Sequence, residues 1–431
     1  MKIARRRSVK IAAFSSTMAA MQTQEFPRPR WEPGFFQIHF VHTGVGESLF
    51  FVFPDGTSML LDCGDHAAIT RGVHAVPAVP GPERLAGEWV ARYVEKANPR
   101  GRDVDWIVVS HFHSDHAGTS YWQKTPRVPA PFPGGPEEPK ALGGCARSGI
   151  GLAAETLRFS RATDRAWPFY EGQERMPTTE ESREVAAHVR ATWSALHRRD
   201  GLVPEPFRLG ATDQFAPLHG SAPGFSVRNV CANGCIAMPD GTVRDLYAGA
   251  ISQGVFAGRE LNENAMSLGM VFSLGRFRFA ACGDFSDRFA MPDGREVFIE
   301  DDLAGAVGRV DVAKIDHHGH HSGGRRLAAA LDPRVWIAPV WDNLHCTDDT
   351  MESLLAGKEP VDALVVPTVL PVRFDGERPW WRFVPDACRT GVHAVVTVRP
   401  DGESYALDLL DARTEDAPAL AHFDFETSPK K

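Results

Sequence analysis

The stretch HFHSDH at residues 111–116 decides the predicted fold, because it carries four potential metal ligands in six residues. It directly follows the run WIVV, which predicts a buried strand, so the six residues belong to the loop at that strand's carboxyl end. Imidazole and carboxylate together suit zinc, manganese or iron, whereas calcium prefers oxygen ligands alone. We expect His111 and His113 to converge on one cation. Asp115 and His116 can then reach a second cation.

The alternative for residues 111–116 is a solvated polar turn, which has no need of three imidazoles. The pattern H-x-H-x-D-H after a strand instead resembles the signature of the metallo-β-lactamase superfamily. HTGVGES at residues 42–48 is similar to the opening of the ComEC-type competence-protein branch, which usually has an aspartate where His42 stands. Two later stretches resemble further landmarks of that branch, namely CGD at 282–284 after a predicted hairpin and DHHGHHS at 316–322 after a predicted strand.

The resemblance implies a set of metal ligands. In chain order these are His111, His113, Asp115, His116, Asp284 and His317. The two carboxylate oxygens of Asp284 could bridge two cations a few ångströms apart. We favour His317 over His318 as the ligand because His317 comes first after the strand, which leaves His318 to face the substrate.

Other residues are implied to act beside the metals. The candidate catalytic residues are Asp115, His318 and His345, the last of which could also be an ordinary loop histidine. Asp62, at the end of a predicted strand, would orient a ligand histidine without touching metal. Asn264 stands twenty residues before Asp284, where many family members carry a histidine. Because asparagine is a poor zinc ligand, we expect the site of His111 and His113 to be the weaker one.

The resemblance also implies an α/β protein, a four-layer αβ/βα sandwich with two packed sheets between outer helices. A Pro/Gly-rich loop and helical sequence interrupt it, with a helical apolar stripe at Val185, Val189, Trp193 and Leu196. We predict five segments: a basic N-terminal arm or leader (1–30), the first half of the metallo-β-lactamase-like domain (31–118), a largely helical insertion (119–224), the second half (225–412) and a polar tail (413–431).

Composition limits the alternatives. With 431 residues, 43% of them hydrophobic, the chain can build a large core. The net charge of −8 argues against a protein that coats nucleic acid non-specifically, although it permits a locally basic cleft. No stretch approaches the roughly 20 apolar residues of a membrane span, so we expect no stable membrane insertion.

Two features bear on the compartment. Seven scattered cysteines resemble no disulfide framework, which favours reduced thiols in a cytoplasmic protein. The run RRR at residues 5–7 partly resembles a twin-arginine export signal, which makes export the alternative. Cys63 and Cys282 each stand beside a candidate aspartate, and we expect them to act as small apolar groups rather than catalytic ones.

We therefore expect a metal-dependent hydrolase that uses a metal-bound hydroxide and two divalent cations, zinc first, with manganese or iron as alternatives. The branch implies a phosphodiester substrate, either nucleic acid or a nucleotide-like molecule. Arginines near the site motifs could hold phosphates, and two tryptophans could stack on a single strand; they are Arg325, Arg326, Arg373, Arg378, Arg382, Arg389, Trp380 and Trp381. The alternative, which the sequence slightly favours, is solvated surface arginines and ordinary core or rim tryptophans.

Two other functions stay open. One is a hydrolase of small esters or lactones on the same fold, in which residues 119–224 should form an apolar lid. The other is a non-catalytic metal-binding scaffold, which the intact metal motifs disfavour. The sequence identifies no protein partner.

Overall fold

The computed structural model describes most of the chain, namely residues 29–65, 76–121, 127–128, 138–139, 146–170, 175, 179–370 and 378–429. Nearly all of the predicted N-terminal arm or leader lies outside the described residues. None of the helices within these ranges has the length and apolar character that a membrane crossing requires.

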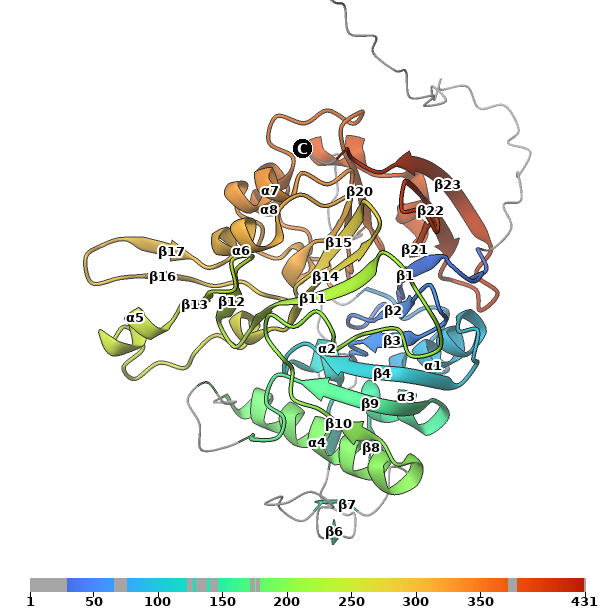
Figure 1. The fold of residues 1–431 in the computed structure, drawn as a ribbon, viewed down its shortest axis with the longest axis horizontal. Coiled ribbons are helices and arrows are strands. Elements are labelled where there is room, and N and C mark those ends of the chain that lie inside the picture. Colours follow the sequence, from blue (N-terminus) through green and yellow to red (C-terminus); the bar gives the residue numbers. More distant parts are fainter. Residues whose placement is uncertain are drawn as a thin grey trace, which may run out of the picture.

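Two large sheets lie in the middle of the molecule (Figure 1). In spatial order, the first sheet consists of β10 (Val203–Pro204), β9 (Arg158–Asp164), β4 (Asp103–Val109), β3 (Ser58–Leu61), β2 (Leu49–Val52), β1 (Phe36–Phe40), β21 (Val392–Val398), β22 (Ser404–Asp411) and β23 (Ala419–Glu426). The second consists of β13 (Val243–Asp245), β12 (Cys235–Ala237), β11 (Phe225–Ala232), β14 (Gly269–Leu274), β15 (Phe277–Ala281), β18 (Val312–Lys314), β19 (Val335–Ala338) and β20 (Leu364–Pro367). Because β1 pairs with β21, the first sheet joins strands from both ends of the described chain.

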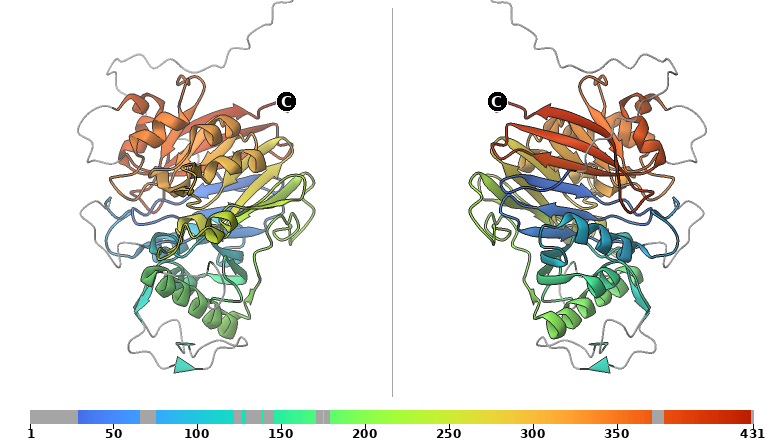
Figure 2. Two further views of the ribbon diagram at one scale, coloured as in Figure 1. Left: turned by 90° about the vertical axis from the view of Figure 1, so that its left-hand side faces the viewer. Right: turned by 90° about the vertical axis from the view of Figure 1, so that its right-hand side faces the viewer.

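Helices cover the outer face of each sheet, which gives four layers (Figure 2). The first sheet is covered by α1 (Ala86–Ala97), α3 (Ile150–Thr156) and α4 (Glu180–Asp200), and the second by α6 (Glu300–Val307), α7 (Arg325–Leu331) and α8 (Asp348–Leu354). The buried apolar side chains form one cluster between the sheets and one between each sheet and its helices. The predicted four-layer α/β sandwich is therefore confirmed.

Strand alternation explains why the two sheets pack against each other. In β2, Leu49 and Phe51 face the other sheet, whereas Phe50 and Val52 face the helices. The ring of Phe51 stacks on that of Phe272 in β14, with centroids 4.5 Å apart and planes at 10°. Because both faces of the strand are buried, its sequence reads as a continuous apolar run.

The longest helix of the described chain, α4, forms where the apolar stripe predicts it. The side chain of Thr179 accepts a hydrogen bond from the Ser182 backbone N–H and caps the amino end. Gly201 ends the helix in a left-handed conformation, with φ of 75°. The predicted stripe of Val185, Val189, Trp193 and Leu196 is buried against the first sheet.

The chain contributes three strands to the first sheet where none is predicted, namely β23, β9 and the short β10, which pairs parallel with β9. The predicted polar tail at 413–431 contains β23, which pairs antiparallel with β22 and forms an edge of the sheet. Its apolar side chains alternate with polar ones and pack on the core between the sheets, a pattern that overall polarity conceals. Within residues 119–224, β9 pairs parallel with β4, so this range supplies a strand besides its helices.

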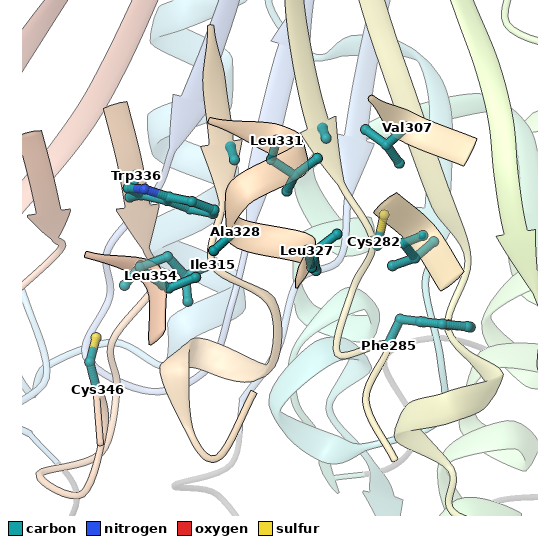
Figure 3. Packing of buried hydrophobic residues seen from close by; sticks show 14 of the residues in the cluster. Cys282, Phe285, Val307, Ile315, Leu327, Ala328, Leu331, Trp336, Cys346 and Leu354 are labelled. Atoms are coloured by element: carbon teal, nitrogen blue, oxygen red, sulfur yellow. The ribbon is translucent and has the colours of Figure 1, made fainter. Parts of the chain in front are cut away.

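The second sheet and its helices enclose Cys282. Figure 3 shows its side chain among apolar residues that include Leu327, Phe285 and Val307. Contact with the Cys231 thiol and burial both raise the pKa of Cys282 well above its ordinary value. The neutral thiol therefore fills space in the core.

The free energy of unfolding of the protein should depend on pH through Glu300, the first residue of α6. Its side chain is buried, and burial raises the pKa of the carboxyl to about 7. Below pH 4.5 the proton is bound in both states, whereas between pH 4.5 and 7 only the folded protein keeps it. The free energy of unfolding should therefore fall across this window by up to about 3 kcal/mol.

Urea unfolding of Glu300→Gln between pH 4 and 8 checks this expectation. The variant should have a smaller pH-dependent step, because Asp316, whose pKa burial also raises to about 7, keeps its own contribution. At pH 8 the variant should exceed the wild type by about 1–3 kcal/mol, because glutamine never ionises. Glu352→Gln, on the exposed face of α8, is the matched control and should change neither quantity. If the unfolding free energy of Glu300→Gln changes with pH as much as that of the wild type, another group causes the pH dependence.

Candidate metal centre

The predicted site residues gather where strands of both sheets end. Asp62 follows β3 and the HFHSDH loop follows β4, which lies parallel to β3. Asp284 follows β15, and the histidines of DHHGHHS follow β18, which lies parallel to β15. The fold thus brings carboxyl ends of strands from two sheets together at one edge.

Asp284 lies at the centre of this group. Its Oδ2 atom is 3.2 Å from His116 Nε2, 3.3 Å from His318 Nε2 and 3.9 Å from His111 Nε2. All four side chains are at most 1% exposed. One carboxylate oxygen therefore faces three imidazoles from two segments, the HFHSDH loop and the turn after β18.

The histidines form two groups around Asp284. In the first, His111 Nε2 is 3.1 Å from His113 Nδ1. In the second, His116 Nε2 is 3.2 Å from His318 Nε2, and Asp115 Oδ2 is 3.0 Å from the same His318 atom. His318 lies where the sequence predicts His317, and the two groups adjoin, because the His111 and His116 ring centroids are only 4.2 Å apart.

The structure places His318, and not His317, in the cluster. His317 Nε2 lies 3.1 Å from the side-chain nitrogen of Asn264 instead. The prediction assumes that the first histidine after an extended strand points inward. However, the chain leaves β18 through two residues in the left-handed region, with φ of 51° at His317 and 53° at His318. The alternation of an extended strand is lost there, so position after the strand does not decide which side chain points inward.

Asp62 lies where it can orient His116. Its carboxylate accepts hydrogen bonds from the backbone N–H and the hydroxyl of Ser110, both at 2.7 Å, and lies 2.8 Å from His116 Nδ1. If His116 donates its Nδ1–H to Asp62, the Nε2 lone pair faces the cluster. A left-handed backbone at Asp62, with φ of 60°, turns its carboxylate toward this position.

His345 and Asn264 lie at the edge of the cluster. The His345 ring stacks on that of His318, with centroids 5.0 Å apart and planes at 15°. Its Nδ1 is buried without a hydrogen-bond partner among the described residues. Asn264 contacts His317, so its amide is turned toward that ring.

Two buried residues of the site are missing from the sequence prediction, Glu47 and Lys314. Glu47 Oε2 is 3.1 Å from Lys314 Nζ and 3.4 Å from His318 Nδ1, and both of these charged side chains are 0% exposed. A lysine inside the apolar run VDVAKI was the available signal, because a buried ammonium requires acidic partners. Glu47 lies within HTGVGES, which the resemblance presents as a turn.

The electrostatics of the cluster fit a bound cation. Burial disfavours protonated imidazole, but Asp284 and Asp115 outweigh it and raise the pKa of His116 well above its ordinary value and that of His318 to about 9. The carboxylates thus stabilise positive charge between the two rings. Glu47, His116, Asp284 and His318 each offer one donor atom, and these atoms lie within 4.8 Å of one another. Buried imidazole and carboxylate donors are those that zinc, manganese and iron accept.

Comparison with known proteins supports this interpretation. The family model of the metallo-beta-lactamase superfamily matches residues 42–141. The match includes Asp62 and the HFHSDH loop, while Asp284 and His318 join them from beyond it through the fold. No curated protein matches the chain. The matched superfamily and the buried cluster together indicate a metal-dependent hydrolase that binds divalent metal.

A buried ion pair holds the HFHSDH loop in place. Arg165, which follows β9, contacts both carboxylate oxygens of Glu263 at 2.6 Å. Glu263 in turn accepts a hydrogen bond from the Phe112 backbone N–H at 2.9 Å. The guanidinium also lies over the Phe112 ring, 4.9 Å from its centroid. Residues 119–224 therefore help to fix the loop that carries His111 and His113.

Replacing Arg165 with Met should destabilise the protein strongly. The substitution leaves Glu263 buried without its cation, and breaking such a pair costs about 3–5 kcal/mol of unfolding free energy. Arg161→Met is the matched control, because Arg161 lies on β9, four residues before Arg165, in a half-exposed pair with Glu205. That pair should contribute about 1 kcal/mol or less. Urea unfolding measures both, and equal losses would contradict a special role for Arg165.

Proposed function

We propose that this protein is a metal-dependent phosphodiesterase with a two-metal centre, related to the ComEC-type branch. The observation that carries the proposal is the position of Asp284 Oδ2, which faces both groups of histidines. His111, His113 and Asp284 would hold one cation. The ligands of the second would be Asp115, His116, Asp284 and His318. Bound divalent cations there would lower the pKa of a water to about 7 and neutralise charge on the electrophile.

The chain's own residues support hydrolysis in specific ways. Asp62 orients His116 through its Nδ1, as described above. His345 is our candidate catalytic histidine, because its buried Nδ1 has no hydrogen-bond partner among the described residues. Burial and the neighbouring His318 and His320 hold its pKa well below the ordinary value, so the ring is neutral and can form a hydrogen bond with a substrate oxygen. The catalytic role of Asp115 would be exerted through the cation and through His318, which it contacts.

The choice of a phosphodiester rests mainly on the resemblance to the ComEC-type branch. Three of the arginines proposed for phosphate binding have acidic partners, since Arg378 pairs with Asp348, Arg382 with Glu359 and Arg389 with Asp386. Trp380 is buried, and Arg373 lies outside the described residues. Arg325 and Arg326 remain as exposed candidates in the first turn of α7.

The ester or lactone alternative receives less support from the structure. An apolar lid from residues 119–224 is what it requires, yet α3 and α4 of this range contribute their apolar faces to the core on the first sheet. The scaffold alternative is disfavoured because the histidines and carboxylates remain buried and converge.

Metal analysis and a substrate screen test the proposal. Purified protein should carry about two equivalents of divalent metal and hydrolyse a chromogenic phosphodiester. Chelation should abolish the activity and added metal should restore it. A phosphomonoester, a lactone and single-stranded DNA complete the screen. Hydrolysis of the lactone alone would favour the alternative enzyme, and metal-loaded protein without any activity would favour the scaffold.

A further inference from the structure

Lys314 is a buried cation within the candidate metal centre. Its side chain, at the end of β18, is 0% exposed, and its Nζ donates a hydrogen bond of 2.6 Å to the Gly283 carbonyl. The same atom lies 3.1 Å from Glu47 Oε2 and 3.7 Å from Asp284 Oδ1. Burial disfavours the ammonium, but Glu47, Asp284 and Asp316 outweigh it and raise the pKa of Lys314.

The two oxygens of Asp284 face different groups. Oδ1 is directed toward Lys314, whereas Oδ2 faces the imidazoles of His116 and His318. The Gly283 carbonyl that Lys314 holds belongs to the residue directly before Asp284. Lys314 thus hydrogen-bonds the backbone directly before Asp284, and its ammonium lies 3.7 Å from Asp284 Oδ1, an oxygen that has no hydrogen-bond partner among the described residues.

Glu47 extends the same arrangement to His318. Its Oε2 lies between Lys314 Nζ and His318 Nδ1, and the Pro339 carbonyl is also 3.1 Å from that ring nitrogen. The opposite ring nitrogen, Nε2, faces Asp115 and Asp284. Glu47 therefore contacts the Nδ1 side of His318, just as Asp62 contacts the Nδ1 side of His116.

We propose that Lys314 is a positioning residue of the metal centre, which directs Asp284 Oδ2 toward the histidines and holds Glu47 behind His318. The inference rests on the proposed metal-binding function. The competing explanation is that Lys314 only neutralises Glu47, which would otherwise be a buried unpaired charge. The two explanations differ in what Lys314 does once Glu47 is uncharged.

The test compares Glu47→Gln with the double variant Glu47→Gln/Lys314→Met, using cobalt(II) alone as the probe. In the Glu47→Gln background, replacing Lys314 leaves no buried, unpaired carboxylate at position 47. If Lys314 orients Asp284, the double variant should bind cobalt about 10–100-fold more weakly than the single variant, the usual cost of losing an outer partner of a metal ligand. Its visible absorption band should also change, because the coordination by Asp284 changes. The control is Lys358→Met, which removes an ion pair with Asp332 at the carboxyl end of α7. It should leave the cobalt affinity and the absorption band unchanged.

The outcomes separate this inference from the proposed function. Equal affinity and equal spectra in the single and double variants would overturn the positioning role. Wild-type protein that binds no cobalt or zinc would instead overturn the metal centre itself. Cooperative urea unfolding checks that each variant is folded. If the Met variant does not fold, Glu47→Gln/Lys314→Gln replaces it, because glutamine can still donate to the Gly283 carbonyl while it lacks the charge, and the same loss of affinity is expected.

Discussion

Asp284→Ala should lower hydrolysis by about 10³-fold or more and weaken both metals together. Asp284 Oδ2 is the one described carboxylate oxygen that faces His111, His116 and His318 at once. Its removal takes a negative charge from between two proposed dications, and metal assistance contributes several kcal/mol to such reactions. Metal content by elemental analysis and the rate of phosphodiester hydrolysis are the two measurements.

The matched control is Asp408→Ala. Asp408 is also a buried carboxylate, but it lies on β22 and pairs with His422 far along the chain from the cluster's residues. Asp408→Ala should keep its metals and its rate per folded molecule even if it is less stable. A variant at Asp284 that loses only one metal would show that this carboxylate belongs to a single site and does not bridge.

Much of the fold could be predicted because the decisive residues follow strands. The HFHSDH loop comes directly after an apolar run, and Asp284 follows a hairpin whose two strands read clearly as β. A ligand at a strand end requires only that the strand be recognised, and apolar runs with β-branched residues make that possible. The clustering of these segments then follows from the sandwich topology.

The parts that could not be predicted depend on contacts between distant segments. The sequence of β9 consists mostly of charged and small residues and has no clear strand pattern. Its place beside β4 therefore depends on backbone pairing with that strand. Glu47 and Lys314 are 267 positions apart, and only the packing of the two sheets makes them an ion pair. The sequence around Lys314 indicates a buried ammonium, but it does not identify Glu47 as its partner.

The choice between His317 and His318 could not be predicted because it depends on an unusual local backbone conformation. Two consecutive non-glycine residues with positive φ are rare, and sequence patterns assume the common extended conformation. The carboxylates of Asp115, Asp284 and Glu47 and the Pro339 carbonyl surround the His318 ring, and these contacts favour this unusual turn. The local sequence DHHG contains no information about those partners.

The two histidines should therefore respond differently to replacement by alanine. His318→Ala removes a ring whose Nε2 lies 3.0 Å from Asp115 Oδ2 and 3.3 Å from Asp284 Oδ2. Loss of a residue outside the first coordination sphere already costs about 10–100-fold in metal affinity, so loss of a direct ligand should cost at least about 100-fold at that site. His317→Ala removes a ring that contacts Asn264 and should leave both metals bound.

Titration with cobalt(II) and elemental analysis distinguish the two variants, and each serves as the other's control because they are adjacent on the same turn. His317→Ala should retain two metals, and any decrease in turnover would then reflect contact with the substrate, with an upper range of roughly 10²–10⁴-fold for a proton-transfer group. Loss of metal in His317→Ala with full retention in His318→Ala would show that the left-handed turn is reversed in the metal-bound protein. The ligand would then be His317, as the sequence pattern predicts, because metal binding would have rotated this turn to present the first histidine.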